Sequence, residues 1–520
     1  MKRKSTEKTK VIVIGLDGAS FELIDPWIEE GALPTMRRIK EEGVYGDLIS
    51  CLPPVTSPNW KCYSTGMNPG KLGIFWWENI DVKNKRIFYP RNRTRVQPEL
   101  WDIIGERGKV CVINMPTTYP PKEVNGFFVA GPPDCPDYDF FHPPEMKEIL
   151  NEFHYKVSPK RVNLLQSETG KDQARAATEI REIIDTKFKL AHALITREKP
   201  IFLHLTIFYI NVLQHFLWDS DFTKEAWRLI DQRIGEFIDS FSNEYTFFFM
   251  SDHGSNKITK VFNINTWLEK KGYLVTNTGK GSLLNTIGLN IDNLARVYHL
   301  LGTGKPKKAM RTLVPDRLLH MLPTREGTFK KESKAHIIDW EKSQAVASGQ
   351  GPIYILANES GKGEIKEKLR QDLETLKNEG IIRDVYAREE IYSGEYLDEA
   401  PDLILDQGKG IHIKGDIGNK EIVEKPNKWR GENKRLGMFL AYGSSIQRND
   451  KIDSVTILDI APTILHLLDI PIPKGMDGQI LKDIFAKDSE VAERPPTYQE
   501  AGERQRIKDR LARLSRSGRI

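Results

Sequence analysis

The chain contains 520 residues, of which 39% are hydrophobic and 29% charged, and its formal net charge is +5. This composition excludes an intrinsically disordered chain, and the length allows a large core with more than one structural unit. Because basic and acidic residues are interspersed and the net charge is small for this size, the charge balance does not predict a nucleic-acid-binding protein.

Short apolar runs alternate with segments of helical periodicity along most of the chain. The runs 11–16 (VIVIGL), 109–114 (KVCVIN), 201–210 (IFLHLTIFYI) and 245–250 (YTFFFM) predict buried strands, and 20–43, 171–196 and 222–241 predict helices. This alternation predicts an α/β fold with a largely parallel sheet. Ligands bind at the carboxyl ends of the strands in such sheets.

Residues 275–340 interrupt this rhythm, because they are rich in Gly, Lys and Asn and contain only short helical pieces. We interpret them as an insertion or cap. The predicted organisation is therefore a first part of the core at 1–274, the cap at 275–340, a second part of the core at 341–487, and a linker with a basic C-terminal helix at 488–520.

Neither the cysteines nor the apolar segments indicate an extracellular or membrane protein. Cys51, Cys62, Cys111 and Cys135 form no C-x-x-C pair and predict no disulfide scaffold. The run at 11–16 is too short for a signal-peptide core, and no stretch approaches the roughly 18 apolar residues of a membrane span. We expect a cytoplasmic protein without a membrane span.

Polar side chains follow several of the predicted strands. Asp17 follows the first strand, Asn211 the third, and the pair Asp252-His253 the fourth. Carboxylate oxygen and imidazole nitrogen are ligands for Zn, Mn or Fe. Taken singly, each residue is explained as well by a helix cap, a turn or a satisfied histidine.

The segment CLPPVTSPNW at 51–60 places Thr56 and Ser57 side by side in a proline-bracketed turn. The pattern is typical of an ordered loop, in which Pro restricts φ and a hydroxyl bonds the nearby backbone. It also fits a nucleophile at the start of a helix, where backbone N–H groups favour anions. The segment alone favours the loop.

The order of these motifs is more specific than any one of them. Asp17-Gly18, Thr56-Ser57-Pro58-Asn59, Gln214-His215 and Asp252-His253-Gly254 together resemble the alkaline phosphatase superfamily, in particular its type I phosphodiesterase/nucleotide pyrophosphatase branch and the predicted prokaryotic members of that branch. The resemblance extends over 15–46, 51–75, 114–126, 251–274, 339–355 and 457–481. It implies a three-layer α/β/α sandwich with a mostly parallel sheet and an inserted cap region.

The resemblance also implies site residues. One divalent metal would be held by Asp17, Thr56, Asp252 and His253, and Thr56, two residues before Pro-Asn, corresponds to the nucleophile rather than Ser57. A hydroxyl beside a bound metal ionises near neutral pH and can attack phosphorus to form a covalent phospho-intermediate.

The second metal site of the family matches less well. Its ligand positions carry Asn211, His215 and Asn433, and Leu72 stands where the family has a His before Gly-Ile. No phosphate-binding Asn is in register near Trp76 and Trp77. Because Asn offers only a neutral carbonyl, this set has no anionic ligand, and we expect one ion, Zn or Mn, rather than two.

Two hypotheses about function remain open. The chain is a metal-dependent phosphodiesterase or phosphomonoesterase that acts on a phosphate ester through Thr56, or it is a weakened or inactive relative that binds or scaffolds a partner. A sulfatase is disfavoured, because Thr56 replaces the modified Cys or Ser, and Trp60 stands where that branch has Arg. Binding of nucleic acid through the basic C-terminal helix has less support, since charged terminal helices are usually just solvated.

Overall fold

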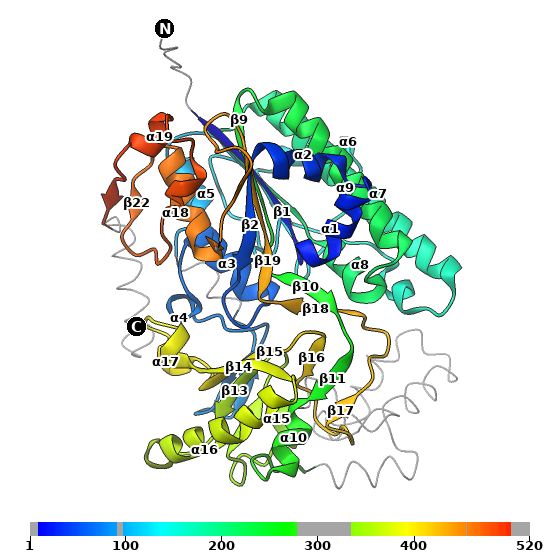
Figure 1. The fold of residues 1–520 in the computed structure, drawn as a ribbon, viewed down its shortest axis with the longest axis vertical. Coiled ribbons are helices and arrows are strands. Elements are labelled where there is room, and N and C mark those ends of the chain that lie inside the picture. The colour runs from blue at the N-terminus through cyan, green and yellow to red at the C-terminus, as the bar shows by residue number, and fades with distance from the viewer. Residues whose placement is uncertain (1–8, 91–96, 278–333, 454, 501–520) are drawn as a thin grey trace.

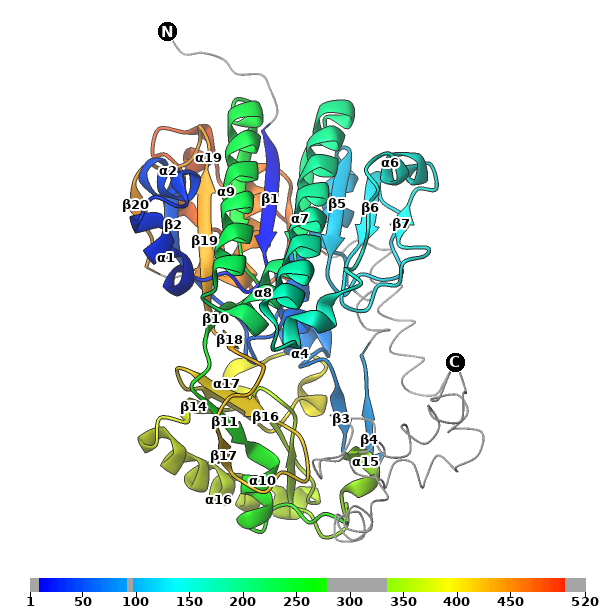
Figure 2. The same ribbon diagram turned by 90° about the vertical axis from the view of Figure 1, so that its right-hand side faces the viewer.

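A computed structural model describes residues 9–90, 97–277, 334–453 and 455–500, which form two lobes (Figures 1 and 2). The larger lobe is built on one sheet whose strands pair in parallel, except that β19 is antiparallel to both neighbours and β7 to β6. Its strands in spatial order are β20 (Asp450–Lys451), β2 (Val44–Ile49), β19 (Leu436–Tyr442), β9 (Tyr245–Met250), β1 (Lys10–Leu16), β8 (Phe202–Ile207), β5 (Val110–Met115), β6 (Gly126–Ala130) and β7 (Phe141–His142), with β21 (Val455–Thr456) beside β2.

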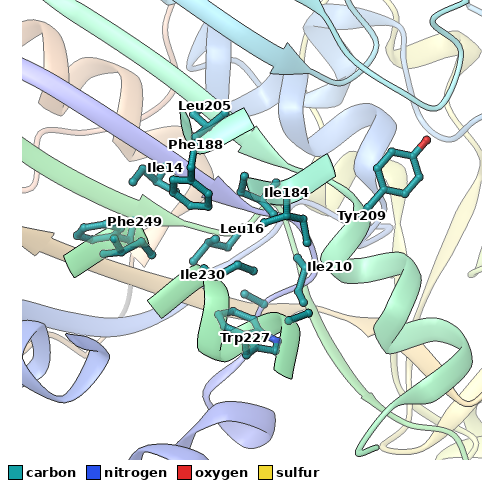
Figure 3. Packing of buried hydrophobic residues seen from close by; sticks show 14 of the residues in the cluster. Ile14, Leu16, Ile184, Phe188, Leu205, Tyr209, Ile210, Trp227, Ile230 and Phe249 are labelled. Atoms are coloured by element: carbon teal, nitrogen blue, oxygen red, sulfur yellow. The ribbon is translucent and has the colours of Figure 1, made fainter. Parts of the chain in front are cut away.

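Helices cover both faces of this sheet. Ile14 and Leu16 of β1 pack into the core shown in Figure 3, whereas Val11 and Val13 pack into a second core on the opposite face. The first core is covered by α1 (Phe21–Glu29), α2 (Pro34–Glu42), α6 (Met146–Glu152), α7 (Gly170–Glu198), α8 (Tyr209–Leu217) and α9 (Asp221–Phe241). The second is covered by α3 (Thr56–Thr65), α4 (Pro69–Leu72), α5 (Leu100–Gly105), α18 (Ile460–Leu467) and α19 (Glu490–Glu493). The predicted α/β fold with a mostly parallel sheet between helical layers is confirmed.

The smaller lobe has its own core, around a four-stranded antiparallel sheet. Its elements are β3 (Asn79–Asp81), β4 (Arg86–Phe88), β11 (Lys260–Asn263), α10 (Ile264–Lys270), α15 (Lys334–Ile337), β12 (Ala345–Ala347), β13 (Pro352–Ile355), α16 (Glu359–Asn378), β14 (Ile382–Ala387), α17 (Arg388–Ile391), β15 (Leu403–Gln407), β16 (Ile411–Lys414) and β17 (Val423–Glu424). The antiparallel pair β10 (Gly254–Lys257) and β18 (Gly431–Lys434) lies between the lobes (Figure 2).

The predicted boundaries along the chain differ from the division into two lobes. The predicted second part of the core, 341–487, contributes first to the smaller lobe, then through β18 to the pair between the lobes, and from β19 onward to the large sheet. The predicted cap, 275–340, falls mostly on 278–333, and the predicted C-terminal helix on 501–520, both outside the described residues. Among the helices described, none is both long enough and apolar enough to cross a bilayer.

Two predicted elements have different bounds in the structure. The helix expected over 20–43 is two helices, because Gly31 adopts a φ of +83° and Pro34 begins α2. The strand expected over 201–210 ends at Ile207, so Asn211 lies in the first turn of α8. An uninterrupted apolar run does not distinguish a buried strand from the start of a buried helix.

Candidate active site

The carboxyl ends of two neighbouring strands bring three of the predicted ligands together. β1 pairs in parallel with β9, so Asp17 and the pair Asp252-His253 leave the sheet at the same edge. All three side chains are fully buried, and one ligand atom from each lies within 4.8 Å of the others. The cluster therefore has the donor types and the spacing of a site for a divalent cation.

Thr56 is the first residue of α3 and joins this cluster. Its Oγ1 lies 3.2 Å from Nε2 of His253. The preceding loop is held by Asn59, whose Nδ2 donates to the carbonyls of Cys51, Pro53 and Val55, and whose Oδ1 accepts from the backbone N–H of Cys51. The Asn of the Pro-Asn motif thus fixes where α3 begins, and with it the position of the Thr56 hydroxyl.

The electrostatics of the cluster favour a bound cation. Burial raises the pKa of Asp17 well above its usual value, and the nearby Asp252 raises it further. Burial also raises the pKa of Asp252 to about 7, although the backbone N–H of Gly18 donates to its Oδ1. Two buried carboxylates that repel each other are stabilised by a positive ion between them.

His253 is oriented to act as a ligand. Its Nδ1 lies 2.9 Å from the carbonyl of Gly254, which can only accept, so Nδ1 carries the proton. The unprotonated Nε2 then faces Asp252 Oδ2 at 3.3 Å and Asp17 Oδ1 at 3.9 Å. Asp252 Oδ2 is buried and has no hydrogen-bond partner within the described part of the chain. A buried carboxylate oxygen without a donor that faces an imidazole lone pair fits a metal ion, so the residues present fit the implied cation.

Trp60 and Asn211 hold Asp17 in place. The Trp60 indole donates to Asp17 Oδ2 at 2.9 Å, and Asn211 Nδ2 donates to Asp17 Oδ1 at the same distance. In this arrangement Asn211 supports the cluster around Asp17 through its N–H group. Its predicted role as a ligand of a second metal stays a prediction. The role of Trp60 was not predicted, because nothing in the sequence indicates which side chain reaches a carboxylate 43 positions away.

The other two residues predicted for the second metal, His215 and Asn433, line the same cavity as Asn211. His215 donates through Nδ1 to the carbonyl of Gly431 at 2.7 Å and stacks on Trp429, with ring centroids 4.0 Å apart. Burial lowers the pKa of His215 to about 4. Asn433, on β18, is buried, and its Oδ1 has no hydrogen-bond partner among the described residues. His215 and Asn433 thus offer two neutral donor atoms.

A carboxylate–imidazole pair that the sequence did not predict, Glu432 and His412, lies beside this second set. Nδ1 of His412 contacts a carboxylate oxygen of Glu432, which directly precedes Asn433. Glu432 also accepts from Gln350 Nε2 at 2.9 Å, from the Asn433 N–H at 2.8 Å and from Trp429 Nε1 at 3.3 Å. Although burial opposes ionisation, His412 and these donors lower the pKa of Glu432 to about 2. With three hydrogen-bond donors and the His412 ring against them, its two oxygens have little capacity left for a metal.

One cavity of about 520 Å³ between the lobes is lined by Thr56 and by the second set with its neighbours, Asn211, His215, His412, Glu432 and Asn433. Its walls include the aromatic side chains of Trp76, Trp77, Phe208 and Trp429, and Thr56 lies at its surface. Leu72, by contrast, is 5% exposed and packs into the core under α3. The position at which the family has His is therefore part of the hydrophobic core in this chain.

A buried ion-pair network anchors the middle of α3, at Lys61. Lys61 Nζ donates to Glu99 Oε1 at 2.6 Å, and Lys122 binds the other oxygen of Glu99 at 2.5 Å. The side chains of Lys61 and Glu99 are 3% and 0% exposed. A buried pair of this kind is costly to break, so it resists displacement of the helix that begins at Thr56.

Comparison with known proteins places this geometry in context. The model of the type I phosphodiesterase/nucleotide pyrophosphatase family matches residues 11–434. Human ectonucleotide pyrophosphatase/phosphodiesterase 5 is 14% identical, with a TM-score of 0.50 over 92% of this chain and 100% of that one. Phosphonoacetate hydrolase from Sinorhizobium meliloti 1021 in complex with phosphonoacetate is 12% identical, with a TM-score of 0.54 over 89% and 96%. At these identities the likeness concerns the fold. No curated protein matches the chain by sequence.

Proposed function

Because the chain belongs to the type I phosphodiesterase/nucleotide pyrophosphatase family, whose members include phosphoryl hydrolases, we propose that it is a metal-dependent phosphodiesterase with Thr56 as its nucleophile. The observation that carries the proposal is the position of the Thr56 hydroxyl. It lies at the start of a helix, 3.2 Å from His253, beside two buried carboxylates and at the wall of a large aromatic cavity. A helix N-terminus favours the negative charge of a phosphoryl group.

Asp17, Asp252, His253 and Thr56 would hold the cation. When bound, it supplies positive charge that favours the ionised hydroxyl and offsets the charge on phosphorus. The chain's own residues position the reacting groups. Asn59 and the Lys61–Glu99 pair fix α3, and Trp60 and Asn211 orient Asp17.

The charges on the cavity wall favour a diester over a monoester. Each described lysine there has a carboxylate nearby, since Lys334 lies 3.7 Å from Glu78 and Lys414 lies 3.2 Å from Asp416, and the imidazole of His412 contacts Glu432. A dianionic monoester would find no uncompensated cation among these residues, whereas a monoanionic diester needs only the metal and the helix N-terminus. The aromatic walls suit a diester with at least one planar or apolar substituent.

The test uses purified protein that has been stripped with a chelator and reloaded with Zn²⁺ or Mn²⁺. We expect turnover of bis(4-nitrophenyl) phosphate, slower turnover of 4-nitrophenyl phosphate, and loss of about 1000-fold or more in Thr56→Ala. Ser57→Ala is the matched control, because it removes the adjacent hydroxyl. Mass spectrometry of a quenched reaction should locate a phosphoryl group on the peptide that contains Thr56. Wild-type turnover in Thr56→Ala would refute the assignment of the nucleophile.

The second candidate is a binding protein with little or no activity. The observation that favours it is the neutral pair His215 and Asn433 at the second ligand set, which holds a second cation poorly. Tight binding of a phosphodiester without turnover in the metal-loaded protein would support this candidate. A cytoplasmic location stays a prediction from the sequence.

A further inference from the structure

The cavity contains a pair of side chains, His412 and Glu432, to which the proposed function assigns no role. His412 lies on β16 in the smaller lobe, and Glu432 lies on β18 between the lobes. The Glu432 side chain is 1% exposed, whereas that of His412 is 21% exposed, and both line the cavity that Thr56 lines. A buried carboxylate thus contacts an imidazole whose ring reaches the space where a substrate would lie.

The contact sets the orientation of the imidazole. Its Nδ1 is the nitrogen that contacts the carboxylate, so Nε2 is on the side of the ring that faces away from Glu432. Glu432 itself is held by Gln350, which in turn accepts from Trp76 Nε1 at 2.9 Å. A carboxylate fixed in this way determines which ring nitrogen carries the first proton, and in the doubly protonated ring Nε2–H is the remaining donor.

The chemistry of the site creates a need for such a donor. In two-metal phosphoesterases the second ion stabilises the leaving oxygen. Here the second ligand set has no carboxylate, and the oxygens of Glu432 are already occupied by donors. A positioned acid can perform the same task by protonating the oxygen as the bond to phosphorus breaks.

We propose that His412, oriented by Glu432, is the proton donor to the leaving-group oxygen, an inference that rests on the proposed phosphodiesterase activity. Thr56 Oγ1 forms a bond to phosphorus and releases its proton to water, while the bond from phosphorus to the leaving oxygen breaks and that oxygen takes the proton from His412 Nε2. Water then displaces Thr56 from phosphorus and reprotonates it, and the neutral imidazole regains a proton from solvent. His215 differs, because its Nδ1 donates to a backbone carbonyl rather than to a carboxylate.

The test compares leaving groups. Metal-loaded wild type, His412→Gln and Glu432→Gln are assayed on methyl aryl phosphodiesters whose leaving phenols rise in pKa. A proton donor matters most for poor leaving groups, so His412→Gln should lose about 100-fold or more with unsubstituted phenol and only a few-fold with 4-nitrophenol. Glu432→Gln should likewise lose more rate with poor leaving groups than with 4-nitrophenol. His192→Gln is the matched control. The His192 ring, on α7, packs against Phe241 of α9 and does not line this cavity.

The outcomes separate this inference from the function on which it rests. A wild type without turnover refutes both. Turnover that depends on Thr56, with a loss in His412→Gln that is equal for every leaving group, refutes only the proton donor and indicates a structural role. A second readout is independent of activity. In protein labelled with ¹⁵N-histidine, the wild type should show a downfield Nδ1 proton of His412 that Glu432→Gln removes. Absence of that signal overturns the inference even where a variant fails to fold.

Discussion

The raised pKa of Asp252 predicts how the stability of the metal-free protein depends on pH. The pKa of this carboxyl rises from 3.8 in the unfolded chain to about 7 in the folded protein, because it is buried. Between these values the folded state holds a proton that the unfolded state has released. The contribution of Asp252 to stability is therefore greatest at low pH, falls as pH rises from about 4 to about 7, and then levels off.

The magnitude follows from the shift. A change of about three units corresponds to about 4 kcal/mol of unfolding free energy lost across that window, as an order of magnitude. Asp17 contributes in the same direction, since its pKa is also raised by burial and by Asp252. A bound cation replaces the proton, so the metal-loaded protein should lack this fall and should gain about 3 kcal/mol when the metal is at 100 times its Kd.

The assay is urea unfolding of chelator-treated protein between pH 4 and 8, followed by the fluorescence of buried tryptophans such as Trp60. The quantity compared is the difference in unfolding free energy between wild type and Asp252→Asn, in which the titration of groups outside the Asp17–Asp252 cluster largely cancels. Asp219→Asn, at an exposed carboxylate, is the control. We expect the wild type to lose stability relative to Asp252→Asn as pH rises. A difference that stays constant over this range would refute the claim that the Asp252 carboxylate is buried without compensation.

Three further predictions follow from the same contacts. Purified protein should retain fewer than two equivalents of transition metal per chain after dialysis, and elemental analysis that finds two would contradict this. Asn211→Asp should destabilise the metal-free protein by about 2 kcal/mol in urea unfolding, because it replaces a hydrogen-bond donor to Asp17 by a third carboxylate beside Asp17 and Asp252. Its combination with Asn433→His should add a second metal ion and faster diester hydrolysis, and a double variant that gains the ion but no rate would favour the binding protein. Lys61→Met should cost about 3 kcal/mol of unfolding free energy, since it leaves Glu99 buried with one partner fewer, and a loss below about 1 kcal/mol would mean that Lys122 suffices.

The fold and the centre of the candidate site were predictable because both depend on local patterns. An apolar run followed at once by Asp17, and another followed by Asp252-His253, indicate two buried strands of a parallel sheet. Parallel neighbours end at the same edge, so residues 235 positions apart were expected to lie together, as they do in β1 and β9. The resemblance then selected Thr56, and the structure brings its hydroxyl to the same cluster.

The surroundings of that centre were not predictable from the sequence, because they depend on which side chains meet across elements distant in the chain. Asn211 was expected at the end of a strand and instead lies in α8, where its amide donates to Asp17. His412 lies in a short strand with no motif around it, and Glu432 directly precedes Asn433 but was given no role by the resemblance. The two residues meet only because β16 joins β11 while β18 joins β10. Hydrophobic periodicity determines the strands and the faces they bury. The partner of each buried polar group is decided by the tertiary packing, since any donor within about 3 Å will serve and a sequence pattern does not specify which one arrives.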